Sequence, residues 1–168
     1  TVAAKAAHLV ERTFQTNGDV LGALAGDRMN SRAAVALRYM TWRKAWNFAI
    51  TEFQLRFGYM RLRALPYEWE IDTTNICQLR CPLCHTGLGN IKREQGTMDY
   101  ELFKQTVDQI HRYCMWLTLY SWGEPFLNPH IHDFVGYAHR RGIGTIISTN
   151  LNKPLNETMA ENIIRSGL

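Results

Sequence analysis

The stretch YEWEIDTTNICQLRCPLCH, residues 67–85, decides how the fold of this chain is interpreted. Its first seven residues alternate and are rich in strand formers, which predicts a β-strand over residues 67–73. Three cysteines with the spacing C-x3-C-x2-C follow at once: Cys77, Cys81 and Cys84. Thiols packed this closely are disulfide partners, inert core residues or metal ligands. The tight spacing favours metal ligands.

The number of cysteines limits what this cluster can be. An iron-sulfur cube held entirely by protein takes four thiolates, so three would leave one iron with an open coordination position. Four cysteines in 168 residues are too few for a disulfide scaffold, and pairing within the triplet would leave one over. This usage favours a reducing compartment, and we expect a cytoplasmic protein.

The composition is that of an ordinary globular protein, with 46% hydrophobic and 20% charged residues. No apolar run approaches the roughly 20 residues that span a bilayer. The N-terminus also lacks an apolar core followed by a small-residue cleavage site. We therefore expect neither a transmembrane segment nor export.

Residues 1–65 are predicted to form a helical N-terminal region. This region carries ten Lys or Arg residues against four Asp or Glu. From Ser31 to about Arg63 there is no proline, and apolar residues recur at helical spacing, which predicts one or two long amphipathic helices that end before Pro66. No cluster of Lys and Arg reaches the density of a nucleic-acid patch, so we expect these charges to cover the outer face of packed helices and expect no nucleic-acid partner.

Strands and helices alternate in residues 66–168. Strands are predicted at 67–73, 115–120 and 145–149. Helices are predicted after Asp99 and Asn128, which can cap a helix, and a last helix is predicted to start near Asn156. Such alternation implies right-handed crossovers and a parallel sheet, which is an α/β fold. Because ligands bind at the carboxyl ends of parallel strands, residues that follow the strands are expected to share one site.

Unusual residues follow all three predicted strands. The cysteine triplet follows the first strand, and the second and third strands are followed by Gly123, Glu124 and Pro125, and by Ser148, Thr149 and Asn150. Glycine lets the backbone approach a ligand closely, and carbonyl or carboxylate oxygens can accept from an ammonium group. Cys114 precedes the second strand, so we expect it at the opposite end of the sheet as a buried structural thiol.

These motifs together resemble the radical S-adenosylmethionine (radical SAM) superfamily over about residues 66–168. The run 67–84 further resembles members that modify peptides or carry a C-terminal SPASM-type extension. The resemblance implies that Cys77, Cys81 and Cys84 bind three irons of a [4Fe-4S] cluster and that the amino and carboxylate groups of SAM chelate the fourth. It also implies reductive cleavage of SAM to methionine and a 5′-deoxyadenosyl radical, which abstracts hydrogen from a peptide or small-molecule substrate.

The resemblance assigns six further residues to the SAM site: Leu83, Gly123, Glu124, Pro125, Ser148 and Asn150. Two positions depart from the family pattern, because Leu83 stands where an aromatic residue is usual and Trp122 stands where the motif usually has a first glycine. The resemblance also implies a one-electron donor such as flavodoxin or ferredoxin.

Three βα units make half of the TIM-like (β/α) barrel that the superfamily implies, in which about six units would be expected. We therefore expect residues 66–168 to be the N-terminal half of a radical SAM core domain. The chain would then be a truncated piece of a longer protein, with most of the substrate pocket beyond it.

Two alternatives fit the cysteines alone. Residues 81–85, CPLCH, match the pattern of c-type haem attachment, although haem attachment needs export and leaves Cys77 without a role. A zinc site of three cysteines and His85 would instead make a non-catalytic, metal-stabilised binding module with a basic helical arm. Neither alternative accounts for the residues that follow the second and third strands.

Overall fold

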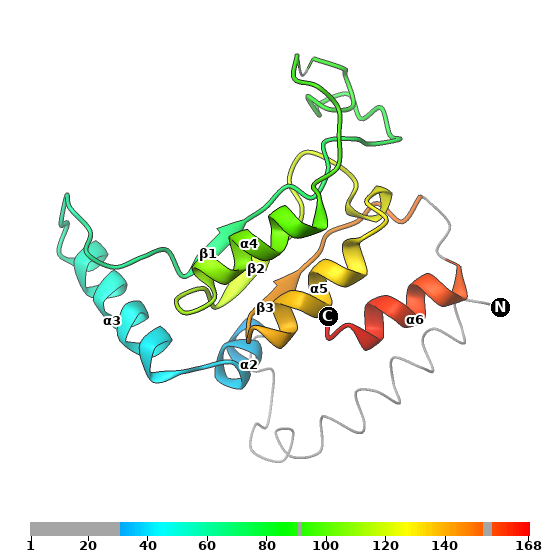
Figure 1. Cartoon of the computed structure of the whole chain (residues 1–168). Helices are drawn as coiled ribbons and strands as arrows, with labels where there is room; N and C mark the ends of the chain where they lie inside the picture. The colour runs from blue at the N-terminus through cyan, green and yellow to red at the C-terminus, as the bar shows by residue number, and fades with distance from the viewer. Residues whose placement is uncertain (1–30, 91, 153–155) are drawn as a thin grey trace.

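The computed structural model describes residues 31–90, 92–152 and 156–168 (Figure 1). The part of the helical prediction that falls on residues 1–30 lies outside these ranges. The described elements run in the order α2 (Ser31–Arg38), α3 (Trp42–Arg56), β1 (Glu68–Glu70), α4 (Tyr100–Ile110), β2 (Trp116–Thr118), the 3-10 helix η2 (Pro125–Leu127), α5 (Ile131–Arg140), β3 (Gly144–Ile146) and α6 (Glu157–Arg165).

The predicted parallel sheet is confirmed. Its strand order is β1-β2-β3, and Trp116 of β2 lies opposite Glu68 on one side and Gly144 on the other. Helix α4 packs against α5, which also contacts α6 and β3 (Figure 1). The regular strands are only three residues long, so the loops that follow them begin earlier than the sequence pattern predicts.

The core lies between the sheet and its helices. Phe103 and Val107 of α4 meet Phe134 and Val135 of α5, with Leu117 of β2 beneath them, and all five are fully buried. The rings of Phe103 and Phe134 stack with their centroids 4.2 Å apart. Each such side chain contributes about 1.5–3 kcal/mol when it leaves water, so this cluster holds α4 and α5 against β2.

The predicted helix cap at Asp99 is confirmed, as is the start of the last helix near Asn156. The Asp99 side chain accepts hydrogen bonds from the first turn of α4, and Asn156 does the same for α6. The prediction for Asn128 was wrong, because α5 begins three residues later, at Ile131. Asn128 is buried, and its amide nitrogen donates to the Thr73 carbonyl over 2.8 Å, so its side chain joins the loop after β2 to the loop after β1.

Of the one or two helices predicted from Ser31 to about Arg63, the structure has two. Thr41 begins a second helix, α3, which ends at Arg56. Gly58 follows with φ +67°, and the Tyr59 N–H donates to the Gln54 carbonyl over 2.9 Å, a left-handed glycine cap. The glycine therefore ends the helix before the apolar pattern does.

Helices α2 and α3 lie at the amino end of the sheet, where the strands begin (Figure 1). Val35 of α2 packs so closely on β3 that a Cβ atom added to Gly144 would lie 2.1 Å from Val35 Cγ1. Lys44 of α3 donates to the Gly142 carbonyl just before β3. The N-terminal helices are thus at the end of the sheet away from the cysteine loop.

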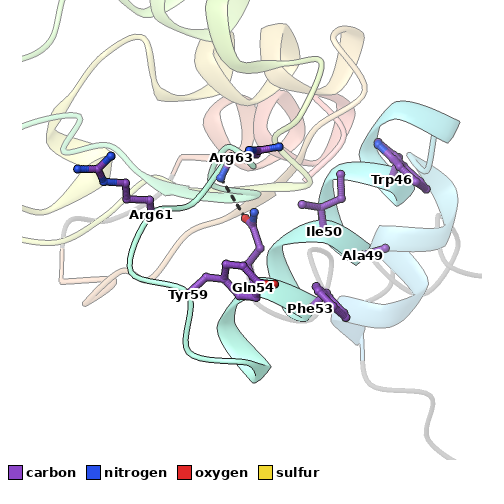
Figure 2. Close-up of a pocket in the computed structure, with 8 residues that line it drawn as sticks. All are labelled: Trp46, Ala49, Ile50, Phe53, Gln54, Tyr59, Arg61 and Arg63. Carbon is purple, nitrogen blue, oxygen red and sulfur yellow. Dashed lines mark hydrogen bonds between the residues drawn. The ribbon is translucent and has the colours of Figure 1, made fainter.

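The expectation that the apolar stripe of this region packs inward is wrong for α3. Its buried residues are polar: Lys44, Asn47, Thr51 and Gln54. Trp46, by contrast, is 65% exposed in the described structure. The result is an open groove of about 850 Å³ whose apolar lining includes Trp46, Ile50, Phe53 and Tyr59. Figure 2 shows these lining residues.

Hydrogen bonds to nearby backbone explain this orientation of α3. The Asn47 amide accepts from the Leu65 N–H over 2.9 Å and donates to the Leu65 carbonyl over 2.8 Å. Gln54 accepts from the Arg63 N–H over 3.1 Å (Figure 2). The polar face of α3 therefore holds the segment that leads into β1.

Candidate functional site

The loops after the three strands meet at the carboxyl end of the sheet, as the sequence predicts. The Glu124 N–H donates to the Ile76 carbonyl over 2.9 Å, which joins the loop after β2 to the cysteine loop. The Asn150 N–H donates to Glu124 Oε2 over 2.9 Å, which joins the loop after β3 to the loop after β2. We call these the three rim loops: residues 71–90, 119–124 and 147–152.

Glu124 is buried between the rim loops, with only 3% of its surface exposed. Its Oε1 atom accepts from the Thr149 hydroxyl and from the Phe126 N–H, and its Oε2 atom accepts from the Asn150 N–H. A buried carboxylate needs such donors, because an unpaired charge away from water is costly. The carboxylate of Glu124 therefore clamps the loop after β2 to the loop after β3.

Gly123 is required by the close approach of two backbones. A Cβ atom added at this position would lie 2.1 Å from the Thr74 carbonyl oxygen and 3.0 Å from that of Ile76. Pro125, which follows Glu124, opens the 3-10 helix η2 and has no N–H to leave unpaired. Each residue of this motif thus has a structural reason to be at its position.

The three cysteines of the rim are free thiols. Cys81 is exposed, whereas Cys77 and Cys84 are partly buried. The loop turns tightly, with the Cys84 N–H bonded to the Cys81 carbonyl over 3.1 Å. Among the described residues, no three His, Cys, Asp or Glu side chains are grouped closely enough to hold a metal ion, so the sulfurs do not converge in this conformation.

The chemistry of the donor set nevertheless fits an iron-sulfur cluster. All three donors are thiols on one short loop, and iron-sulfur clusters are held by thiolates. The backbone N–H of Gly87 faces Cys84 and, with a smaller effect from Thr86, lowers the pKa of the Cys84 thiol. A lowered pKa favours the thiolate, which is the form that binds metals. Gly87 also packs on the Cys81 backbone, where a Cβ atom would lie 2.7 Å from the Cys81 nitrogen.

Cys114 is separated from this set, as predicted. It is fully buried, and its thiol donates to the Trp116 carbonyl over 3.1 Å at the amino end of β2. Burial raises the pKa of this thiol to about 12. Cys114 is therefore a structural thiol at the opposite end of the sheet.

The remaining residues assigned to the SAM site are Leu83, Ser148 and Asn150, and only Asn150 is bonded to Glu124. Leu83 is at the tip of the cysteine loop and is 96% exposed. Ser148 is exposed on the loop after β3. Asn150 lies closest to the cysteines, with its side-chain nitrogen 3.8 Å from Cys77 Sγ. The structure therefore brings Asn150, Glu124 and the start of the cysteine loop together and leaves Leu83 outside that group.

Several residues that support the rim were not found from the sequence. The Thr86 hydroxyl donates to the Trp122 carbonyl, and the Trp122 N–H donates to Asp72 Oδ1 over 2.9 Å. The rings of His85 and Trp122 lie 5.8 Å apart. The sequence signal for Asp72 and Thr86 was a polar side chain near the cysteine loop. Such side chains are too common in loops to predict these contacts.

Comparison with known proteins identifies the family that this fold and cysteine loop define. The model of the radical SAM superfamily matches residues 71–168. That match covers more than half of the chain, so the chain belongs to the radical SAM superfamily.

Particular relatives match a smaller part of the chain. A tungsten-containing aldehyde ferredoxin oxidoreductase cofactor-modifying protein from Pyrococcus furiosus is 33% identical over 82 residues, 48% of this chain and 22% of the relative. The mycofactocin maturase MftC from Mycobacterium tuberculosis is 30% identical over 82 residues, 49% of this chain and 20% of the relative. The matched segment thus spans about a fifth of the length of these curated relatives.

Solved structures show the same fold. The crystal structure of BtrN in complex with AdoMet and 2-DOIA superimposes with a TM-score of 0.55 at 24% identity, over 62% of this chain and 43% of BtrN. BtrN in an open conformation gives a TM-score of 0.53 at 22% identity, over 64% of this chain and 49% of that one. The three parallel strands and their helices are accordingly part of a TIM-like radical SAM barrel. In the described part of the chain, no helix has the length and apolar character needed to cross a membrane.

Proposed function

We propose that this chain supplies the cluster-binding and SAM-binding part of a radical SAM enzyme. Cys77, Cys81 and Cys84 would hold three irons of a [4Fe-4S] cluster. The observation that carries the proposal is the separation of the cysteines: three lie on a rim loop tied to Glu124, and Cys114 is buried at the other end of the sheet. No fourth cysteine of this chain is placed to close the set.

When bound, the cluster and SAM would supply one-electron reduction of the sulfonium and, with it, a 5′-deoxyadenosyl radical that abstracts hydrogen from a substrate. The chain's own residues would bind and orient SAM. Backbone carbonyls at residues 123–125 would accept the methionine ammonium. The buried Glu124 side chain would hold this segment in place through its bonds to Thr149 and Asn150. Ser148, Asn150 and Leu83 would make further contacts to SAM.

The substrate class is proposed from the relatives. One is a cofactor-modifying protein by name and another is a maturase, so we propose a peptide or small molecule that is modified on the way to a cofactor. Electrons would come from a donor such as flavodoxin or ferredoxin. Both matches cover only 82 residues, about a fifth of each relative. We propose that most substrate contacts are made by parts of the enzyme outside the matched segment.

The experiment that tests the proposed function is SAM cleavage. The full-length protein, reconstituted with iron and sulfide without oxygen, is mixed with dithionite and SAM, and 5′-deoxyadenosine is measured by chromatography. We expect 5′-deoxyadenosine from the natural protein and none when Cys77, Cys81 and Cys84 are replaced by alanine. A colourless protein that binds zinc and leaves SAM intact would contradict the proposal and support the zinc-stabilised binding module.

A further inference from the structure

Asn150 has an unusual position for a residue at the end of a strand. Its side-chain nitrogen lies 3.8 Å from Cys77 Sγ, across 73 residues of sequence. Amide nitrogen and sulfur at this distance form an N–H···S hydrogen bond, which is longer than a bond to oxygen because sulfur is larger. The contact joins the loop after β3 directly to the first cysteine of the triplet.

The direction of the Asn150 amide is fixed by its other partners. Its Oδ1 atom accepts from the Asn152 backbone N–H over 2.9 Å and from the Gln78 side-chain amide over 3.0 Å. A backbone N–H can only donate, so the atom that faces Asn152 must be the oxygen. The NH2 group therefore points to Cys77 and has no choice of orientation.

The backbone of Asn150 is held as firmly as its side chain. Its N–H donates to the buried carboxylate of Glu124 over 2.9 Å. The next residue, Leu151, has φ +51°, a left-handed conformation that is unfavourable for a leucine, and its N–H is bonded to the Thr149 hydroxyl over 3.1 Å. Strain of this kind persists only where the surroundings impose it, and it is common beside functional groups.

We propose that Asn150 donates a hydrogen bond to the Cys77 thiolate when that thiolate is a cluster ligand, and so raises the reduction potential of the cluster. The inference rests on the proposed function. Reduction adds negative charge to the cluster and its sulfurs, so a donor aimed at one sulfur stabilises the reduced state more than the oxidised state. Glu124 and Gln78 are positioning residues, because they act through Asn150.

The test is the midpoint potential of the reconstituted full-length protein, measured by EPR-monitored redox titration. Asn150→Leu removes the donor without adding charge. We expect the reduction equilibrium to become less favourable by about tenfold, which lowers the midpoint by about 59 mV for a one-electron couple. Asn152→Ala is the matched control: it removes an amide from the same loop but keeps the backbone N–H that orients Asn150, and its midpoint should be that of the natural protein.

A second variant keeps the test decisive if Asn150→Leu does not retain iron. Asn150→Asp preserves the oxygen that accepts from Asn152 and Gln78 but removes the amide donor, and its midpoint should also fall. The inference would be overturned if the midpoint potential of Asn150→Leu equalled that of the natural protein. If only Asn150→Asp holds iron, an unchanged midpoint potential in that variant would overturn it. If the natural protein itself shows no iron-sulfur EPR signal, the proposed function fails instead, so the two failures are distinguishable.

Discussion

Both ends of the sheet contain cysteines and buried polar side chains, but these residues have different surroundings at the two ends. At the carboxyl end, the cysteine loop carries one exposed and two partly buried thiols, and the buried carboxylate of Glu124 joins the loop after β2 to the loop after β3. At the amino end, α2 and α3 close the sheet, a thiol is fully buried, and the polar face of α3 is turned inward. Buried polar side chains are therefore found both at the candidate site and at the structural end of the sheet. The two ends differ in their thiols, because Cys81 is exposed and Cys114 is buried.

The largest difference expected between the two ends is thiol reactivity. Burial raises the pKa of Cys114 to about 12, whereas an unperturbed cysteine titrates near 8.5. At pH 8 the thiolate of Cys114 should thus be roughly a thousandfold rarer than that of an ordinary cysteine. In metal-free protein, iodoacetamide should label Cys77, Cys81 and Cys84 and spare Cys114, as read by mass spectrometry of the peptides. Labelling of Cys114 at the same rate without denaturant would show that the amino end is open.

The next largest effect should come from the clamp at the carboxyl end. Glu124→Ala leaves three buried or partly buried donors without their acceptor, on Phe126, Thr149 and Asn150. We expect the free energy of unfolding to fall by about 3 kcal/mol, measured by urea denaturation. Glu124→Gln is the matched control, because it keeps one acceptor oxygen, and it should lose about half as much. Equal stability of the alanine variant and the natural protein would show that the rim loops do not depend on this carboxylate.

A somewhat smaller effect is expected at Gly123. Gly123→Ala places a methyl group 2.1 Å from the Thr74 carbonyl oxygen, so the two backbones must separate. We expect a loss of about 2 kcal/mol in thermal or urea unfolding, together with weaker iron uptake. Gly96→Ala, in the segment between the cysteine loop and α4 and with nothing within 4 Å of the added carbon, should change stability by less than about 0.5 kcal/mol. Similar results for the two variants would contradict the close approach.

The smallest effects are expected on α3, where the polar face is buried and the apolar face is exposed. Polar residues of this helix should therefore contribute more to stability than large apolar ones. Asn47→Ala removes two hydrogen bonds to the Leu65 backbone and should lower the free energy of unfolding by about 1.5 kcal/mol. Trp46→Ala, which truncates a much larger side chain, should lower it by less than about 0.5 kcal/mol, because Trp46 is mostly exposed. Both are measured by urea denaturation of the full-length protein. A loss of several kcal/mol for Trp46→Ala would show that another part of the protein covers this face.

The sequence was sufficient for the sheet and for the meeting of the rim loops. Alternating strands and helices predict a parallel sheet with right-handed crossovers. The carboxyl ends of parallel strands lie at one edge, so the loops that carry Cys77 and Glu124 were expected to meet there. The cap at Asp99 was predictable because capping is a local interaction between a side chain and the first turn.

The rest depended on contacts between distant segments. Periodicity shows that α3 has an apolar face, but it does not show which face packs against the rest of the protein. The polar face does so, because the Asn47 amide forms two hydrogen bonds with the Leu65 backbone. The amide of Asn150 was noted as a candidate ligand of SAM, yet its approach to Cys77 depends on a left-handed Leu151 and on Gln78, neither of which carries a distinctive pattern.

The central claim, that three cysteines of one rim loop hold the cluster and the fourth does not, is tested most directly by iron analysis. Full-length protein is reconstituted with iron and sulfide without oxygen, desalted, and assayed for iron, labile sulfide and visible absorbance. The account predicts about four irons per chain for the natural protein and for Cys114→Ala, and a loss of iron for Cys77→Ala, Cys81→Ala and Cys84→Ala. Loss of the cluster in Cys114→Ala, with retained iron in any one of the three rim variants, would contradict it.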